Sequence, residues 1–179
     1  MSTTLSNPNV SVQLKCQLTG GAAPAVVTSQ VNHQPNVAIG SGNTAGNVDR
    51  CFSEPFTVSA GSPLTINLTS ATDPLGNALT FVHVSSVLVE NDGTTAGQDF
   101  TVGGGTHPVL GTDQGTAQAN GGAFFVINPN PGYSVVSAAS DTLQISVASG
   151  TNVPGKVTVF GRGCVTCYAA FDAGSVHNQ

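Results

Sequence analysis

Apolar and polar residues alternate along most of this chain with a period of two, which is typical of half-buried β-strands. The alternation is clearest at residues 64–68 and 143–147, where every second residue is Leu, Ile or Val. A third alternating run, residues 10–18, carries Val, Val, Leu, Cys and Leu at its apolar positions. No window repeats its apolar residues with the 3.6-residue period of an amphipathic helix. The pattern therefore predicts an all-β fold.

Turn residues separate these runs. The chain has 22 Gly and 10 Pro, which favour turns and interrupt helices. Roughly eight short strands at 8–12-residue spacing predict a β-sandwich or jelly-roll-like core. The longest strand is expected at residues 79–90, and its change of apolar phase indicates a β-bulge or burial on both faces. Asn91-Asp92-Gly93 predicts a hairpin turn after it, and Val153-Pro154-Gly155 predicts another turn.

The pattern divides the chain into three parts. Residues 1–50 are expected to form an extended N-terminal arm or a peripheral hairpin, which ends in a Gly- and Asn-rich linker at residues 40–47. Residues 51–162 form the β-sandwich core, and residues 163–179 form a C-terminal tail. The arm has an apolar face that it cannot bury alone, so strand addition to a neighbouring subunit is expected. The predicted interface residues are Val10, Val12, Leu14 and Leu18.

Charge is scarce. Charged residues are 7 % of the chain, against about 25 % in an ordinary soluble domain. Lys15, Arg50, Lys156 and Arg162 are the only Lys and Arg residues, and the net charge is −5. Direct binding to nucleic acid or to an anionic membrane needs clustered basic residues, so neither is expected. A surface of Ser, Thr, Asn, Gln and Gly suits a protein that is covered by other protein, and this indicates an assembly component.

The four cysteines leave three interpretations open. Free thiols are favoured for Cys16, Cys51, Cys164 and Cys167 in a reducing cytosol. Cys164 and Cys167 have the C-x2-C spacing of a zinc knuckle, but no second C-x2-C pair exists to complete it. A disulfide formed after release from the cell is the third interpretation. No metal and no cofactor are expected, and Cys164 and Cys167 are the candidate ligands if a metal binds.

No catalytic motif is present, so an enzyme is not expected. The histidines are scattered, and the carboxylates of Asp73 and Asp113 fall in turns, where Asp usually bonds its own backbone. The first eight residues lack the basic and apolar regions of a secretory signal, and no apolar run is long enough to span a membrane. Synthesis in a cytosol is the resulting expectation.

Two segments resemble a known group of proteins. One is LTINLTSATDPLGNALTF (64–81) leading into VLVEN (87–91), and the other is SDTLQISVASG (140–150) followed by GKVTVFGR (155–162). Together they resemble small β-rich structural proteins of tailed bacteriophage virions, of the capsid decoration (cement) and head- or tail-fibre kinds. The resemblance covers about residues 51–162 and implies a β-sandwich that forms homo-oligomers, often trimers, on a virion.

From the resemblance and the scarce charge, the leading expectation is a non-enzymatic capsid decoration protein. It would be made in the host cytoplasm, act on the virion and bridge capsomers. Its expected partners are copies of itself, with a trimer favoured, and the major capsid protein or another virion protein. The alternative is a tail- or head-fibre or adhesin module that binds a host glycan. A polysaccharide depolymerase is a third class, for which the chain offers no acid/base pair.

Overall fold

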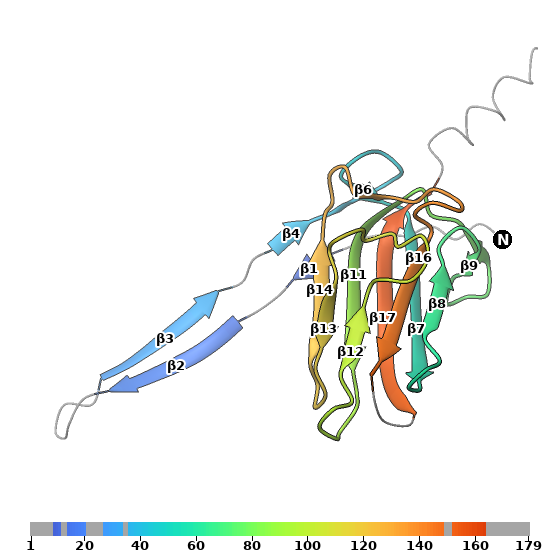
Figure 1. Ribbon diagram of the computed structural model, residues 1–179. Helices are drawn as coiled ribbons and strands as arrows, with labels where there is room; N and C mark the ends of the chain where they lie inside the picture. Colours follow the sequence, from blue (N-terminus) through green and yellow to red (C-terminus); the bar gives the residue numbers. More distant parts are fainter. Residues whose placement is uncertain (1–8, 12–13, 21–26, 34–35, 149–151, 164–179) are drawn as a thin grey trace, which may run out of the picture.

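The computed structural model describes residues 9–11, 14–20, 27–33, 36–148 and 152–163. Every regular element in these ranges is a β-strand, so the predicted all-β fold is confirmed. Two antiparallel sheets pack face to face as a sandwich, and one hairpin projects from it (Figure 1). The jelly-roll variant of this fold stays a prediction.

The larger sheet has five strands. β11 (His83–Asn91) and β17 (Val153–Arg162) are central, and they pair antiparallel. β7 (Arg50–Val58) pairs with the far side of β17 and forms one edge. β14 (Ala123–Ile127) and β15 (Tyr133–Ser134) both pair with β11 and share the other edge.

The smaller sheet has four strands in the order β13-β12-β16-β8. Its strands are β13 (Gly115–Ala117), β12 (Phe100–Val102), β16 (Thr142–Val147) and β8 (Leu64–Asn67). Short pairs lie outside both sheets: β5 (Gly40–Ser41) with β6 (Asn47–Val48), and β9 (Ala71–Thr72) with β10 (Ala78–Leu79).

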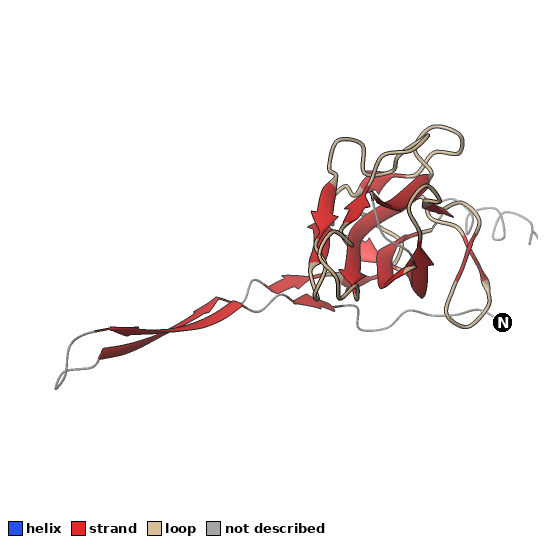
Figure 2. Ribbon diagram, turned by 60° about the horizontal axis from the view of Figure 1, so that its bottom comes forward, coloured by secondary structure: helices blue, strands red, loops and turns tan. Residues whose placement is uncertain are grey.

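The N-terminal strands form the projecting part of the molecule, which Figure 2 shows from a second direction. β1 (Asn9–Ser11) pairs with β4 (Asn36–Ala38), and β2 (Leu14–Gly20) pairs with β3 (Val27–His33). We call the β2–β3 pair the arm hairpin.

The core lies between the two sheets because each strand turns its apolar residues to the same side. In β16 the predicted alternation is confirmed: Leu143, Ile145 and Val147 are buried, and the residues between them are not. In β17 the buried residues are likewise every second one from Val153 to Gly161. Phe81 and Phe100 are the largest fully buried side chains among the described residues. Such burial is the main term that stabilises a sandwich.

Connections between strands mostly cross from one sheet to the other. The chain passes from β7 to β8, from β11 to β12, from β13 to β14 and from β15 to β16 by crossing, and it crosses again from β16 to β17. Only β12–β13 and β14–β15 follow one another within a sheet. The two sheets are therefore interleaved along the sequence.

The predicted bulge in the strand ending near residue 90 is confirmed, since the register of β11 with β17 shifts between Val84 and Ser86. The predicted hairpin after it is wrong. β11 ends at Asn91, and the chain then crosses to β12 in the other sheet. The buried Asn91 side chain holds this crossing: its amide donates to Gln98 O and Ala117 O, each at 2.8 Å, and its oxygen accepts from Gly93 N.

Two further expectations are corrected. The longest strand is β17, with 10 residues, and not the one at residues 79–90. The turn predicted at Val153-Pro154-Gly155 is instead the beginning of β17. Proline lacks an N–H donor, but Pro154 O accepts from Asp92 N, which lies just beyond the end of β11. The missing donor therefore falls just beyond the last pair of the β11–β17 ladder, Asn91 with Gly155, where its cost is small.

Candidate functional site

The arm hairpin stands away from the sandwich in both views (Figures 1 and 2). Its strands pair over seven positions, from Leu14 opposite His33 to Gly20 opposite Val27. A two-stranded hairpin alone is marginally stable in water, because it has no second layer on which to bury a face. Among the described regions, this ribbon therefore has the most to gain from a partner surface.

Three of the four predicted interface residues lie in this N-terminal part. Val10 is in β1, and Leu14 and Leu18 are in β2, while Val12 lies outside the described residues. Alternate positions of a strand share a face, so Leu14 and Leu18 fall on the same face of the arm hairpin. Their role in an interface stays a prediction.

The two edges of the five-stranded sheet differ in how they are protected. Edge strand β7 exposes Glu54 and Pro55, and a charge and a proline both discourage further strand pairing. Edge strand β14 has neither. Phe124 and Val126 of β14 pack against the core, and Phe125 on the opposite face is 36 % exposed. The β14 edge is the less protected of the two.

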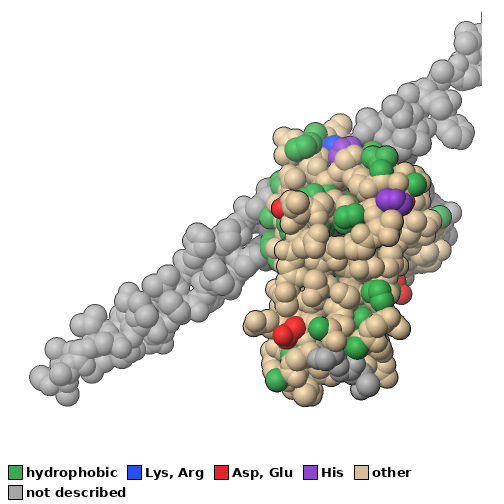
Figure 3. Space-filling model, in the orientation of Figure 1, with side chains coloured by type: hydrophobic (Ala, Val, Ile, Leu, Met, Phe, Trp, Pro, Cys, Tyr) green, Lys and Arg blue, Asp and Glu red, His purple; other side chains and the backbone are tan. Residues whose placement is uncertain are grey.

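The surface of the sandwich is nearly uncharged. In Figure 3 most of the visible face is uncharged polar side chain or backbone, with scattered apolar, acidic and histidine groups and one small basic patch. Of the basic side chains that the structure describes, only Lys156 is exposed. Arg50 is half-buried and pairs with Asp49 at 3.4 Å. Few basic groups are therefore available on the described surface to form ion pairs with a partner.

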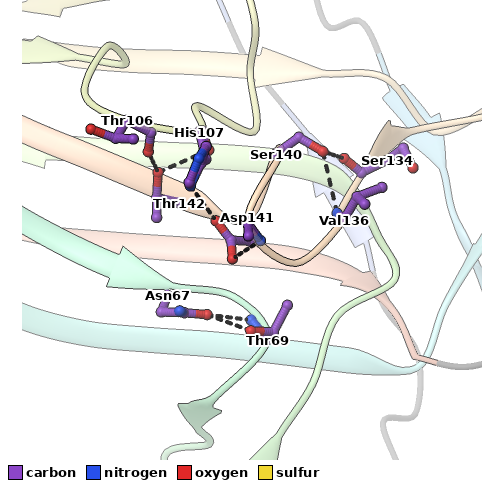
Figure 4. A network of polar contacts seen from close by, with 10 residues as sticks. Asn67, Thr69, Thr106, His107, Ser134, Val136, Ser140, Asp141 and Thr142 are labelled. Atoms are coloured by element: carbon purple, nitrogen blue, oxygen red, sulfur yellow. Dashed lines mark hydrogen bonds and ion pairs between the residues drawn. The ribbon is translucent and has the colours of Figure 1, made fainter.

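A polar network fixes the beginning of β16 (Figure 4). Thr142 Oγ1 lies 2.6 Å from Thr106 O and 2.9 Å from His107 O, and Thr142 N donates to His107 O. The buried Asp141 accepts from Ala138 N at 2.8 Å, and its other oxygen lies 3.8 Å from His107 Nδ1.

A His–Asp pair of this kind can serve as a general base when a nucleophile is hydrogen-bonded to the imidazole. Among the described residues, no hydroxyl is hydrogen-bonded to the His107 ring. Thr142 and Asp141 instead bond to backbone atoms of the neighbouring loops. The network thus anchors the neighbouring loops to β16.

The carboxylates named from the sequence act within turns and loops. Asp73 Oδ1 accepts from Leu75 N and Asn77 N, as predicted for an Asp in a turn. Asp113 accepts from the Tyr133 hydroxyl at 2.8 Å. Burial first, and then this hydrogen bond and the charge of Asp113, raise the pKa of Tyr133 to about 12. Tyr133 therefore remains a hydrogen-bond donor over the whole physiological range.

The cysteines are only partly placed. Cys51 lies half-buried in β7 as a free thiol. Burial first, and then the charge of Asp73, raise the pKa of Cys51, so the thiolate that reacts or binds metal is disfavoured. Cys16 is in β2, and Cys164 and Cys167 lie outside the described residues. The described residues contain no group of three or more potential metal ligands. The zinc and disulfide interpretations both need the undescribed cysteines and stay predictions.

Sequence reasoning did not single out Arg162, which is 6 % exposed in the structure. Its position in the β17 alternation places it on the outer face of the sheet, where an Arg is expected to be solvated. The burial depends on residues far away in the sequence, so no local pattern signals it.

Comparison of the chain with protein-family models, with curated proteins and with solved structures found no match. A helix long and apolar enough to cross a membrane is absent from the described part of the chain. A functional proposal therefore has to rest on the residues of this chain itself.

Proposed function

We propose that this protein is a non-enzymatic structural component of a virus particle, namely a decoration protein that reinforces a capsid shell. The observation that carries the proposal is the arm hairpin, which projects from a sandwich that has almost no charged surface. A sandwich with a projecting two-stranded hairpin is suited to linking neighbouring subunits of a shell. The sequence resemblance to phage virion proteins supports the choice of a capsid.

Strand pairing is the proposed means of attachment. In β-augmentation, one chain adds a strand to an exposed sheet edge of another, and backbone hydrogen bonds supply much of the affinity. The arm hairpin offers the added strands, and the less protected β14 edge offers a receiving sheet. Each Leu side chain that passes from water into such a contact contributes about 1.5–3 kcal/mol. In this proposal the copies form a homo-oligomer, with a trimer favoured, and the major capsid protein is the second partner.

A variant that lacks the arm hairpin tests the proposal. Ser11 and Asn36 are register partners in β1 and β4, so an Asn-Gly turn in place of residues 12–35 closes the chain as a short hairpin. Ile39 and Val48 are buried and must be kept. We expect the variant to remain folded by circular dichroism, to sediment as a monomer and to lose binding to the particle.

Point variants provide a matched comparison on the two faces of β2. Leu14→Ser with Leu18→Ser removes two leucines from one face, and Gln17→Ser with Thr19→Ser changes the other face. The first pair should weaken self-association and particle binding, and the second pair should leave both unchanged. If the hairpin-less chain binds particles as well as the full chain does, the arm has no part in attachment.

Labelling of the full chain in electron micrographs of its source particle separates the capsid proposal from the fibre alternative. Label on the shell supports decoration. Label confined to tail or head fibres, together with a specific signal on a glycan array, would replace decoration by the adhesin function.

A further inference from the structure

Arg162 is a buried cation on the outer face of the five-stranded sheet. It ends β17 and lies directly opposite His83, the first residue of β11. Alternate residues of β17 from Val153 to Gly161 face the core, so Arg162 points to the other side. Its exposed fraction is nevertheless 6 %.

The connection between β4 and β7 lies against this end of β17. β6 contacts β17, Gly46 N donates to Pro129 O, and Asp49 N donates to Gly161 O. Ile39 and Val48 of the connection are buried, although neither belongs to the core between the sheets. Arg162 thus lies where the end of β17, this connection and the loop at residues 129–131 meet.

The guanidinium of Arg162 has few partners there. One amino group, Nη2, donates to Pro131 O at 3.1 Å, and Nε is buried with no hydrogen-bond partner. Among the described residues, the two pairs at ion-pair distance are Arg50 with Asp49 and His107 with Asp141, so no described carboxylate neutralises Arg162. A buried charge without a counter-ion is costly, and proteins normally give it an anionic partner.

His83 has an unused group on the same side of the sheet. Its Nδ1 is buried and has no hydrogen-bond partner. Directly opposite residues of an antiparallel pair have Cβ atoms about 4.5–5.5 Å apart, so the two side chains are neighbours. Burial first, and then the charge of Arg162, lower the pKa of His83. The imidazole is therefore neutral at neutral pH and can donate from Nδ1.

We propose that Arg162 and His83 bind one small oxyanion of the phosphate or sulfate class. Arg Nε–H and an adjacent amino N–H are parallel donors, which match two oxygens of such an anion, and His83 Nδ1 donates to a third. The small exposed fraction favours a small anion over an extended polyanion such as nucleic acid. The bound anion neutralises Arg162 and thereby holds the β4–β7 connection, from which the arm leaves, on the sheet. This site is independent of the proposed assembly function.

The chain allows a direct test, because Arg50 and Arg162 are its only arginines. A ¹⁵N-labelled full chain should therefore show two Nε–Hε signals, and Arg50→Lys assigns them. Inorganic phosphate is titrated at pH 7 against chloride at constant ionic strength, with sulfate and acetate in parallel. We expect a saturable downfield shift of the Arg162 signal with phosphate or sulfate, and no saturable shift for Arg50.

Thermal unfolding supplies a second measurement. Saturating phosphate should raise the Tm by about 2–4 °C relative to chloride. Arg162→Gln and His83→Phe should abolish this rise, and Arg50→Gln should retain it. The proposal is overturned if the Arg162 signal does not respond, if both arginine signals drift together without saturation, or if the wild-type Tm is equal in phosphate and chloride. The NMR titration uses the wild-type side chains, so it decides the matter even if Arg162→Gln fails to fold.

Discussion

Strand β16 of the sandwich and strand β2 of the arm hairpin have similar sequences in different settings. In β16, Leu143, Ile145 and Val147 alternate with polar residues. In β2, Leu14, Cys16 and Leu18 do the same. β16 lies between β12 and β8, and its Leu143, Ile145 and Val147 are at most 5 % exposed. β2 has β3 as its one strand partner among the described elements. Alternation therefore predicts a strand and its apolar face, but not the surface on which that face is buried.

The largest contrast is expected from truncating one apolar residue in each region. Phe100 is fully buried and its ring lies 5.2 Å from that of Phe56, so Phe100→Ala should lower the free energy of unfolding by about 3–5 kcal/mol. Leu18→Ala in the arm hairpin should change it by less than about 0.5 kcal/mol. Urea denaturation at low protein concentration measures both. A large loss from Leu18→Ala would mean that the arm hairpin folds against the body.

The crossing after β11 should be nearly as sensitive as the core. In Asn91→Asp, the carboxylate cannot donate to Gln98 O or Ala117 O, and we expect a loss of about 2–4 kcal/mol at pH 7. The loss should shrink at low pH, since protonation restores one donor. Asn67→Asp is the matched control, because the exposed Asn67 oxygen only accepts, from Thr69. Equal losses in the two variants would show that the Asn91 bonds do not hold the crossing.

The rates of trypsin cleavage in the arm hairpin and in the sandwich can be compared on the wild-type chain. Lys15 is in the arm hairpin, and Lys156 is in β17, which has strand partners on both sides. Cleavage needs local opening, which costs little in a two-stranded ribbon and nearly the whole stability in a central strand. We expect cleavage after Lys15 to be at least about tenfold faster, equivalent to about 1.4 kcal/mol, by mass spectrometry of timed digests. Equal cleavage rates after Lys15 and Lys156 would show that the arm hairpin opens no more easily than the central strands of the sandwich.

The smallest effect is expected at the rim of the body. Tyr133→Phe removes the hydrogen bond to Asp113, which is partly exposed, and should cost less than about 1 kcal/mol. The pKa of Tyr133 is raised from 10.0 to about 12, so above pH 10 the unfolded chain loses this proton first. Stability should therefore fall as the pH rises from about 10 to 12, and Tyr133→Phe should reduce that fall. If the free energy of unfolding of Tyr133→Phe falls as steeply between pH 10 and 12 as that of the wild type, Tyr133 is not the group that causes the fall.

The features that could be predicted from the sequence are those set by residues adjacent in the chain. The strand alternation in β8 and β16 and the bulge in β11 depend on neighbouring residues, so they could be predicted. The hairpin expected after Asn91 was wrong because the turn residues cannot tell which strand comes next in space. The burial of Arg162 could not be predicted either, since Pro131, to which it donates, is distant in the sequence. Long-range packing decides both.

The interleaving of the two sheets also bears on how the chain reaches its native state. Since successive strands alternate between layers, neither layer can be completed from one continuous stretch of sequence. Contact order is high in such a topology, and folding of such domains takes milliseconds to seconds. Unpaired edges remain open during that interval. At high concentration, the open edges of one partly folded chain can pair with those of another, so slow folding favours aggregation.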